Sequence, residues 1–292
     1  MTPALSGTGW LELPGAPGKE EYVQATYMDP SVDKTDHADK TLRNYTYNYD
    51  KDMFTSLWVA YPLYADAISG SNSAGWKGDP NVPDNYEINI YDKSYKVNVG
   101  STDSTGYDED LPYYARGHQI PNADRKTSAS KNSQTYYVTN STPQNSKFNG
   151  GIWKSLEDAV RNAIPANDTI YVVTGAAFQK VGETRSVTWI LPEAEAAAGT
   201  DKLCPVPNYY WKVLLKVRRD SDGKVTSASS VGMWYEHQDY TGSGKSYNDD
   251  SFDVSVNQIE QWTGFDFFVN LSDSLEETAE SNASWTTFRN FQ

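Results

Sequence analysis

The stretch from residue 113 to residue 157 constrains the chain most, because four chemically capable side chains stand there at two informative spacings. Arg116 and His118 are two residues apart in an Arg-Gly-His segment that we expect to form a turn. Asn149 and Glu157 are eight residues apart in a segment with helical periodicity. On a helix of ~3.6 residues per turn, that spacing returns two side chains to nearly the same face. We therefore expect an imidazole, a guanidinium, an amide and a carboxylate to meet in one pocket.

The Arg-Gly-His segment suits chemistry on a phosphate. A neutral imidazole with a pKa near ~6.5 accepts a proton from water at neutral pH, which makes His118 a candidate general base. Arg116 carries a fixed positive charge that pairs well with phosphate oxygens. We expect Gly117 to permit the tight turn that exposes the imidazole. An ordinary surface or core histidine is the competing interpretation of so short a motif.

The second pair suits a divalent cation. The amide oxygen of Asn149 is a hard, neutral donor, and Mg²⁺ commonly keeps several waters while taking few protein ligands. Glu157 can accept hydrogen bonds from water molecules held by such an ion. Both residues also have plainer interpretations, since an Asn before Gly-Gly often caps a helix and a helical Glu is often exposed to solvent. Together, the four groups indicate metal-assisted cleavage of a phosphodiester bond.

Four further polar residues of this stretch are weaker candidates for binding the substrate or supporting the site, namely Asn140, Gln144, Arg125 and Lys147. We expect Asn140 and Gln144 to hold their loop in place rather than to touch a metal. Trp153 recurs at helical spacing with apolar residues and is expected to lie in the core.

Charge is distributed unevenly along the chain. The net charge of -14 opposes the binding of nucleic acid, because neutralising phosphates supplies most of the non-specific affinity. Residues 113–164, however, carry seven basic and three acidic side chains, a local balance of +4, whereas the other 240 residues carry a balance of -18. A basic segment on an acidic body is what local phosphate binding needs, although a solvated charged face explains the same count.

The first half of the chain predicts strands followed by a helix. Residues 53–64 form a dense apolar and aromatic run that indicates a buried strand. Residues 86–98 alternate around an Asp-Lys-Ser turn and indicate a short hairpin or a broken strand. Residues 134–139 have the composition of a further strand. Apolar residues from 152 to 164 recur at helical spacing and indicate a helix.

The second half of the chain predicts three further β-strands. Residues 169–178, 209–219 and 227–237 are β-rich, and the Asp222-Gly223 pair between the last two is a strong hairpin signal. We therefore predict an α+β fold, with a central, mostly antiparallel β-sheet and flanking helices.

Helix signals and the chain ends complete the expected organisation. Ser255 and Gln258 are spaced as a capping box, and Gly264 is placed to end the helix that they begin. Residues 1–20 are rich in Pro and Gly and are expected to form an extended N-terminal arm, pinned to the body by Trp10 and Leu11. Residues 21–292 are then expected to form a single domain.

Three features bear on the compartment. Cys204 is the only cysteine, which rules out an intrachain disulfide, and we expect it to be a small, part-buried thiol. No apolar run approaches the ~20 residues needed to cross a bilayer, so no membrane insertion is expected. Neither a basic nor an apolar leader follows Met1, so we expect no targeting segment in this sequence.

Longer motifs are more discriminating than single residues. The ordered series RGHQIPNAD, TNSTPQ and FNGGIWKSLE is preceded by WVAYPL and followed by IYVVTGAAF, YYWKVLL and IEQWTGFDFF, over about residues 53–272. In this order the motifs resemble those of the DNA/RNA non-specific endonuclease family, whose active site is a ββα-metal motif. The resemblance places that motif at about residues 113–164.

The resemblance implies a role for each central residue. His118 matches the general base of the family, and Asn149 matches its sole direct protein ligand to Mg²⁺. Glu157 matches the residue that orders metal-bound water, and Arg116 matches the arginine beside the histidine.

The same resemblance implies partners and products. The cofactor would be Mg²⁺, with Mn²⁺ or Ca²⁺ as substitutes, and the substrate would be DNA or RNA held through its backbone phosphates. The products would carry 5′ phosphates. An exported protein, periplasmic or extracellular, is expected, and a homodimer is compatible with the family.

Two departures from the family pattern stand out. The family motif usually begins Asp-Arg-Gly-His, but Ala115 occupies the Asp position here. An upstream active-site arginine of the family aligns near Ala74. Either change would lower activity or move phosphate neutralisation to another basic residue, and neither removes the base or the metal ligand.

A protein of another class also accounts for part of the composition. Nine Trp and 21 Tyr on an acidic chain suit a secreted glycan-binding or nucleic-acid-binding module that retains the nuclease fold with little or no activity. Cleavage of plasmid DNA in the presence of Mg²⁺ and of a chelator distinguishes the two classes.

Overall fold

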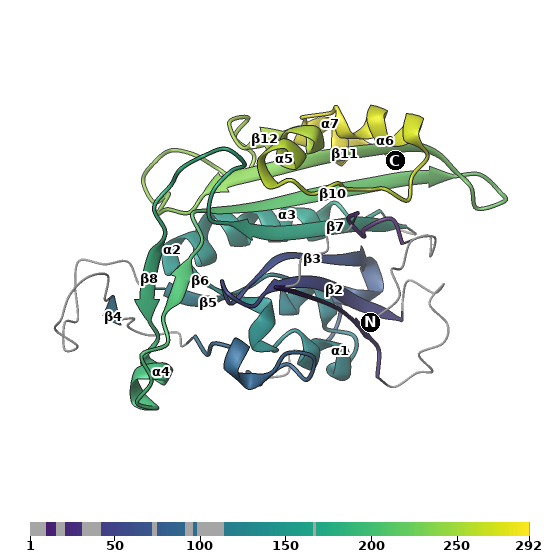
Figure 1. Ribbon diagram of the computed structural model, residues 1–292. Coiled ribbons are helices and arrows are strands. Elements are labelled where there is room, and N and C mark those ends of the chain that lie inside the picture. Colours follow the sequence, from purple (N-terminus) through teal and green to yellow (C-terminus); the bar gives the residue numbers. More distant parts are fainter. Residues whose placement is uncertain are drawn as a thin grey trace.

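A seven-stranded sheet forms the centre of the computed structural model, which describes residues 10–15, 21–30, 42–71, 75–90, 96–97, 114–165 and 168–291. All neighbouring strands of this sheet are antiparallel, in the order β1-β2-β3-β7-β10-β11-β12. The strands are β1 (Tyr22–Met28), β2 (Arg43–Asp50), β3 (Thr55–Tyr64), β7 (Thr169–Ala177), β10 (Tyr209–Arg219), β11 (Val225–Glu236) and β12 (Asp253–Val254). Figure 1 shows the β10–β11 hairpin extending beyond the other strands. The predicted α+β fold with a central antiparallel sheet is confirmed.

Both faces of the central sheet are buried. In β3, Val59 and Tyr61 lie in one hydrophobic core, whereas Trp58 and Ala60 lie in the other, as the period of two in a strand requires. Because each face packs against an apolar layer, the central strands are apolar at nearly every position rather than at alternate ones. The strand predicted at residues 53–64 is confirmed as β3.

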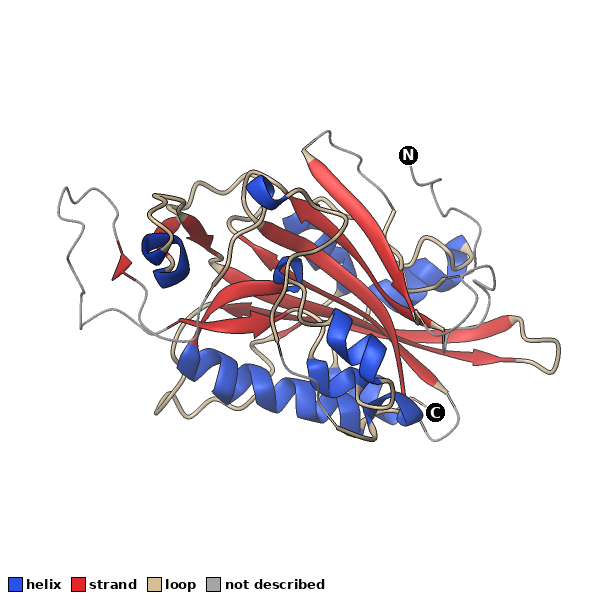
Figure 2. Ribbon diagram, turned by 90° about the horizontal axis from the view of Figure 1, so that it is seen from below, coloured by secondary structure: helices blue, strands red, loops and turns tan. Residues whose placement is uncertain are grey.

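Short helices cover these two faces. On the first face lie α3 (Lys154–Asn162) and α7 (Trp285–Asn290), and on the second lie α5 (Val256–Thr263) and α6 (Asp273–Glu280). In Figure 1, α5, α6 and α7 lie along the β10–β11 end of the sheet, whereas α1 (Ala129–Gln134) lies near β2 and β3. Figure 2 shows the helices packed outside the twisted strands.

The predicted signals for α5 and for the β10–β11 hairpin are confirmed. The Ser255 hydroxyl accepts a hydrogen bond from the backbone N–H of Gln258 at 3.1 Å, which caps the first turn of α5. Gly264 ends the helix with a left-handed φ of 76°, and Gly223 turns the hairpin with a φ of 81°. Both conformations favour glycine because it has no Cβ.

Part of the N-terminal segment packs on the second face of the sheet. Trp10 and Leu11 are buried, as predicted, and the Arg43 guanidinium lies 4.5 Å from the centre of the Trp10 ring. Residues 1–9 and 16–20 lie outside the described residues, so the extended arm over residues 1–20 stays a prediction.

Residues 134–139 do not form the predicted strand. The segment closes local turns instead: the N–H of Tyr137 donates to the carbonyl of Gln134 at 3.2 Å, and the N–H of Asn140 donates to the carbonyl of Tyr137 at 2.9 Å. Aromatic and β-branched residues form a strand only where a partner strand is within reach. Its one β-type contact in the described part of the chain is an isolated parallel bridge between Lys77 and Tyr137.

Of the two alternatives predicted for residues 86–98, the described part fits a broken strand and not a hairpin. Tyr86 ends a 3₁₀ turn, and the two-residue strand β4 (Lys96–Val97) pairs with β8 (Thr188–Leu191) rather than with its own neighbours. Residues 91–95 lie outside the described residues. The pairing partner of β4 is distant in sequence, so local alternation could not identify it.

The remaining elements are short. The strands β8 and β9 (Cys204–Val206) pair in a small sheet with β4, and Cys204 is fully buried there, deeper than predicted. The 3₁₀ turns are Ala65–Ile68, Asp84–Tyr86, Asn122–Arg125 and Val138–Asn140, and the short helix α4 is Glu193–Ala197. No helix in the described part of the chain has the length and apolarity that crossing a bilayer requires.

Candidate active site

The Arg-Gly-His segment lies in a strand, not in the turn that we expected. β5 (Tyr114–His118) and β6 (Ser141–Asn145) form a two-stranded antiparallel ribbon in which His118 stands opposite Ser141. Successive side chains of a strand point to opposite faces, so Arg116 and His118 share one face of the ribbon. Both side chains are partly exposed. Strand geometry therefore brings the guanidinium and the imidazole together.

Gly117 permits close packing rather than a turn, which corrects its expected role. It does not have a positive φ, and a Cβ added to it would lie 2.1 Å from the side-chain carbon of Gln144. Gln144 is buried on this second face of the ribbon, so only glycine fits beneath it. Ala115 shares the second face and therefore points away from the face that carries His118.

The second strand of the ribbon leads directly into the helical segment that carries Asn149 and Glu157. The side chain of Asn145, the last residue of β6, caps α2 (Ser146–Phe148) by accepting from two backbone N–H groups at 2.9 and 3.2 Å. Ribbon and helix are therefore joined without an intervening loop, in the order strand, strand, helix.

The prediction of one uninterrupted helix from Asn149 to Glu157 is wrong, because a wider π turn (Asn149–Trp153) precedes α3. Gly151 in this turn has a φ of -105° and a ψ of -111°, a conformation outside the helical region. A π turn takes in about one residue more than an α turn, so eight residues span about two turns here. A Cβ added at Gly150 or Gly151 would meet no other described residue within 4 Å. The space beside these two glycines is therefore open.

His237 holds the junction between β6 and α2. Its Nε2 accepts a hydrogen bond from the backbone N–H of Asn145 at 2.6 Å, and its Nδ1 lies 2.7 Å from the carbonyl oxygen of Pro207. These partners place the ring proton on Nδ1. Burial lowers the pKa of His237 to about 4, so the ring stays neutral at pH 7. Nothing in the sequence around His237 indicated this role.

Glu157 lies among other charged groups. Burial raises the pKa of Glu157, the charge of Lys212 lowers it, and the charge of Asp124 raises it. Lys212 is buried on β10, where its ammonium lies 4.5 Å from the centre of the Trp153 ring. Trp153 is itself buried, as predicted.

A buried ion pair ties α3 to the central sheet. The guanidinium of Arg161 lies 2.7 Å from Asp124 and 2.6 Å from Asp158. Tyr61 of β3 donates a hydrogen bond to the other oxygen of Asp124 at 2.8 Å. The helix that carries Glu157 is thus held against β3 by polar as well as apolar contacts.

Two of the weaker candidates support the fold. Asn140 is buried, and its amide hydrogen bonds to the backbone of Ile120 and Thr135 over 2.8 to 3.1 Å. Arg125 is buried too, and its guanidinium donates to the carbonyls of Asn44 and Pro62 at 2.6 and 2.9 Å. Of the two roles expected for Arg125, the structure places it in the supporting one.

Most basic side chains of residues 113–164 are paired with acidic side chains or buried in the protein. Lys147 is exposed, with its ammonium 3.2 Å from Asp239. The other paired or buried basic residues of the 113–164 segment are Arg125, Lys131, Lys154 and Arg161. The balance of +4 is therefore no measure of the charge offered to a phosphate.

Two aromatic residues that the sequence did not indicate surround the candidate base. The Trp76 ring lies 4.6 Å from the His118 ring and 4.9 Å from the Arg116 guanidinium. The Tyr136 ring meets the His118 ring edge-on at 5.1 Å. Trp76 precedes β5 by a long stretch of chain, so no spacing rule could place it against His118.

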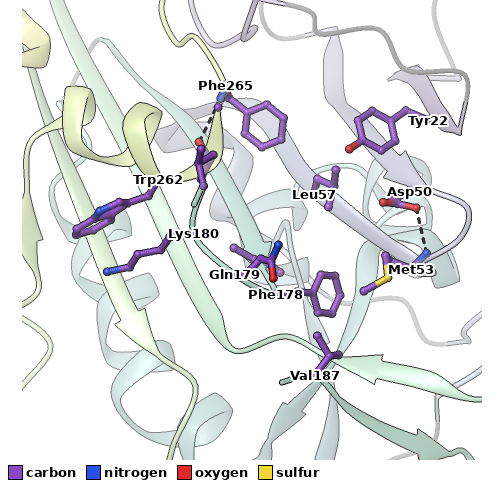
Figure 3. Close-up of a pocket in the computed structure, with 15 residues that line it drawn as sticks. Tyr22, Asp50, Met53, Leu57, Phe178, Gln179, Lys180, Val187, Trp262 and Phe265 are labelled. Atoms are coloured by element: carbon purple, nitrogen blue, oxygen red, sulfur yellow. Dashed lines mark hydrogen bonds between the residues drawn. The ribbon is translucent and has the colours of Figure 1, made fainter. Parts of the chain in front are cut away.

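A separate cavity lies away from the ribbon and its helix. A cavity of about 600 Å³ is lined by residues such as Tyr22, Leu57, Lys180, Trp262 and Phe265, and none of the predicted site residues borders it. Figure 3 shows aromatic and apolar side chains around this cavity, with Asp50 and Lys180 at its margins. It does not hold the combination of base, arginine and amide found on the ribbon and helix.

Comparison with known proteins places the chain among nucleases. A family model described as DNA/RNA non-specific endonuclease matches residues 25–274. The nuclease of Nostoc sp. is 25% identical over 243 residues, covering 81% of this chain and 75% of the relative. The nuclease of Serratia marcescens is 27% identical over 239 residues, covering 81% of this chain and 77% of the relative.

Mitochondrial and structural relatives extend the comparison. Bos taurus mitochondrial endonuclease G is 24% identical over 216 residues, covering 74% of this chain and 65% of the relative. A solved structure of the EndoG/EndoGI complex matches with a TM-score of 0.57 and 20% identity, covering 80% of this chain and 86% of that chain, and so supports the fold. The chain belongs to the DNA/RNA non-specific endonuclease family and is a nuclease.

Proposed function

We propose that this nuclease is a divalent-metal-dependent endonuclease that cuts DNA and RNA without sequence preference and leaves 5′ phosphates. The carrying observation is the placement of Arg116 and His118 on one face of a ribbon whose second strand runs directly into the helix of Asn149 and Glu157. The proposed active site is formed by these four residues.

Within this proposal, His118 acts as the general base. Its imidazole takes a proton from a water molecule whose oxygen bonds to phosphorus, while the bond from phosphorus to the 3′ oxygen breaks. The departing oxygen leaves on the 3′ side, so the phosphate stays on the 5′ end of the product. Arg116, on the same face of β5, shares the negative charge of the phosphate.

The residues present fit a sparsely ligated Mg²⁺. The described part of the chain has no group of three or more His, Cys, Asp or Glu residues able to hold a metal ion, so a fully protein-made cage is not available there. Asn149 is partly exposed and offers a hard amide oxygen, and Mg²⁺ is suited to one such ligand with several waters. When bound, Mg²⁺, or Mn²⁺ or Ca²⁺ in its place, would stabilise negative charge on the phosphate and the departing oxygen. Glu157 would orient its water molecules from α3.

The proposed contacts to backbone phosphates predict activity on nucleic acids of any sequence. Arg116 and Asn149 would contact the phosphate backbone, which is the same for every base, so little sequence preference is expected. RNA is cut as well as DNA where no contact excludes the 2′ hydroxyl. The family name agrees with this breadth. A non-catalytic binding module is not favoured, because the family match spans most of the chain.

The departure at Ala115 leaves the proposed reacting groups in place. Ala115 lies on the face of β5 opposite to His118, so the missing carboxylate removes no group from the base's own face. Ala74 lies outside the described residues. Export and a homodimer stay predictions.

Cleavage of supercoiled plasmid tests the proposal directly. The wild-type protein should nick plasmid in Mg²⁺ and lose activity in EDTA, and His118→Ala should lower the rate at least about 1,000-fold while leaving circular dichroism unchanged. Product ends should accept a labelled phosphate from polynucleotide kinase only after phosphatase treatment. Near-normal cleavage by His118→Ala, or ends that label without phosphatase, would count against the proposal.

The metal assignment has its own test. Asn149→Ala should weaken Mg²⁺ binding by about tenfold or more in titration calorimetry, because it removes the one direct protein ligand proposed. Asn162→Ala, on the exposed side of α3, is the matched control and should bind Mg²⁺ as the wild type does. Equal Mg²⁺ affinity in the wild type and Asn149→Ala would remove Asn149 from the site.

A further inference from the structure

Trp76 makes contact with both polar groups that the ribbon presents. Its ring lies 4.6 Å from the imidazole of His118, tilted by 46°, and 4.9 Å from the guanidinium of Arg116. Arg116 and His118 are two residues apart on one strand face, a separation of roughly 6 to 7 Å that one indole can span. The same side chain therefore packs on the proposed base and on the proposed phosphate ligand.

Tyr136 packs against both His118 and Trp76. Its ring meets that of His118 at 5.1 Å and 88°, and that of Trp76 at 5.4 Å and 72°. The amide of Asn122 donates a hydrogen bond to the Tyr136 hydroxyl at 2.9 Å, which fixes the tyrosine ring. The imidazole thus packs between two aromatic rings with different orientations, which restricts its rotation about both side-chain bonds.

The backbone holds Trp76 in this position. The N–H of Lys77 donates to the carbonyl of Tyr136, and the N–H of Val138 donates to the carbonyl of Lys77, both at 3.0 Å. The Lys77 ammonium also bonds the Ser133 hydroxyl at 2.7 Å and lies 4.8 Å from the Tyr137 ring centre. This explains why residues 136–138 form a single bridge rather than a strand: they anchor the segment that carries Trp76.

We propose that Trp76 is a positioning residue that keeps His118 and Arg116 in one alignment for attack on the phosphate. This inference rests on the proposed function, because it assigns the base and the phosphate ligand to these two residues. Trp76 is only partly exposed and makes its ring contacts with the protein, so its effect should act through His118 and Arg116 rather than through the substrate. A displacement of about 1 Å in a reacting group can lower a rate by about 100-fold.

Steady-state kinetics on duplex DNA test the effect on activity. Trp76→Ala should lower kcat by about 10- to 100-fold and change KM by less than about threefold, and Trp76→Phe should recover most of the loss. The matched control is Trp262→Ala. Trp262 is also partly exposed and lies against a cation, with the Lys180 ammonium 3.6 Å from its ring centre, but it borders the separate cavity of Figure 3. Its removal should leave kcat and KM unchanged.

A second readout does not depend on cleavage. The imidazole C–H resonance of His118, assigned in a carbon–proton NMR spectrum by its disappearance in His118→Ala, should be shifted by the rings of Trp76 and Tyr136. In Trp76→Ala this resonance should move toward the position of a free histidine, and the pH profile of kcat should shift with it. Trp262→Ala should leave it in place.

The experimental results distinguish the proposed nuclease function from the positioning role of Trp76. An inactive wild type would reject the proposed function, while the NMR comparison would still decide whether Trp76 positions His118. An unchanged kcat, an unchanged His118 resonance, or a loss confined to KM would overturn the positioning role, the last because it indicates contact with substrate. Should Trp76→Ala fail to fold, Trp76→Leu, which keeps apolar volume without an aromatic face, carries the same expectations.

Discussion

Two groups of ionisable side chains lie on opposite faces of the central sheet, one of mixed charge and the other acidic. The group on the site side contains carboxylates and cations, namely Asp124, Glu157, Arg161 and Lys212. The group under the C-terminal helices contains carboxylates, namely Glu260, Asp266, Glu276 and Glu280. Each is packed beside one of the two apolar cores.

The presence or absence of cations decides how each group responds to pH. On the site side, Arg161 lies 2.7 Å from Asp124, and the charge of Lys212 opposes the rise that burial causes in the pKa of Glu157. Burial still outweighs Lys212 and raises the pKa of Glu157 to about 7, so the fixed charges beside the proposed metal site are those of the Arg161–Asp124 pair. Under the C-terminal helices, burial and neighbouring carboxylates together raise the pKa of Glu280 to about 9. That region holds protons at neutral pH, so it makes stability depend on pH instead of supplying charge.

The largest expected effect comes from breaking the mixed group. Asp124→Asn leaves the buried guanidinium of Arg161 without its inner carboxylate, and we expect unfolding free energy to fall by about 3 kcal/mol in urea titration. Asp158→Asn, which removes the more exposed carboxylate of the same arginine, is the control and should cost no more than about 1 kcal/mol. Equal losses from both variants would show that burial of the pair does not matter.

The acidic group under the C-terminal helices should make the free energy of unfolding depend on pH. The pKa of Glu276 is raised to about 7 and that of Glu280 to about 9, both by burial first and then by neighbouring carboxylates. A carboxyl with a raised folded-state pKa contributes stability that is present below its unfolded pKa of ~4.5 and is lost as pH rises through the folded value. Stability should therefore fall as the pH rises from about 4.5 to about 9.

Glu280→Gln tests this dependence because it keeps the size of the side chain and removes the ionisation. The variant should match the wild type at pH 5 and be more stable by about 2 kcal/mol at pH 9, as measured by urea unfolding at each pH. Glu277→Gln, on the exposed side of the same helix, should leave the pH dependence unchanged. A constant gap between Glu280→Gln and the wild type across this range would contradict the assignment.

The smallest effect should come from the exposed pair of Lys147 and Asp239. Lys147→Ala removes a solvent-exposed contact with Asp239 and should leave the free energy of unfolding unchanged within error. If Lys147 also attracts substrate, KM on DNA should rise about two- to fivefold at low salt and return toward the wild-type value as salt is added. Lys154→Ala, which breaks another exposed pair on α3, is the control for a general charge effect.

The sequence predicted best where a local rule is sufficient. The Asp222-Gly223 turn, the capping of α5 by Ser255 and the end of that helix at Gly264 each depend on residues a few positions apart. The apolar run of β3 was also recognisable, because a strand buried on both faces is apolar almost throughout. In all these cases the favoured conformation is set by the residues themselves.

Prediction was wrong where a distant partner decides the conformation. The Arg-Gly-His segment forms a strand because β6 pairs with it, and Gly117 is needed because Gln144 packs over it from that partner strand. Residues 134–139 have the composition of a strand, but they turn locally and bond to the segment of Lys77. The break in the predicted helix at Gly151 likewise has no counterpart in apolar periodicity.

The amino-acid sequence by itself determined the family, the antiparallel α+β fold and the four residues proposed for catalysis, because these follow from ordered motifs and local periodicity. Only the tertiary structure decided that Trp76 and Tyr136 pack around His118, that His237 holds Asn145, and that most basic residues of the segment are already paired. Contacts between segments far apart in the chain depend on how the sheet brings them together, and no spacing within the sequence encodes that arrangement.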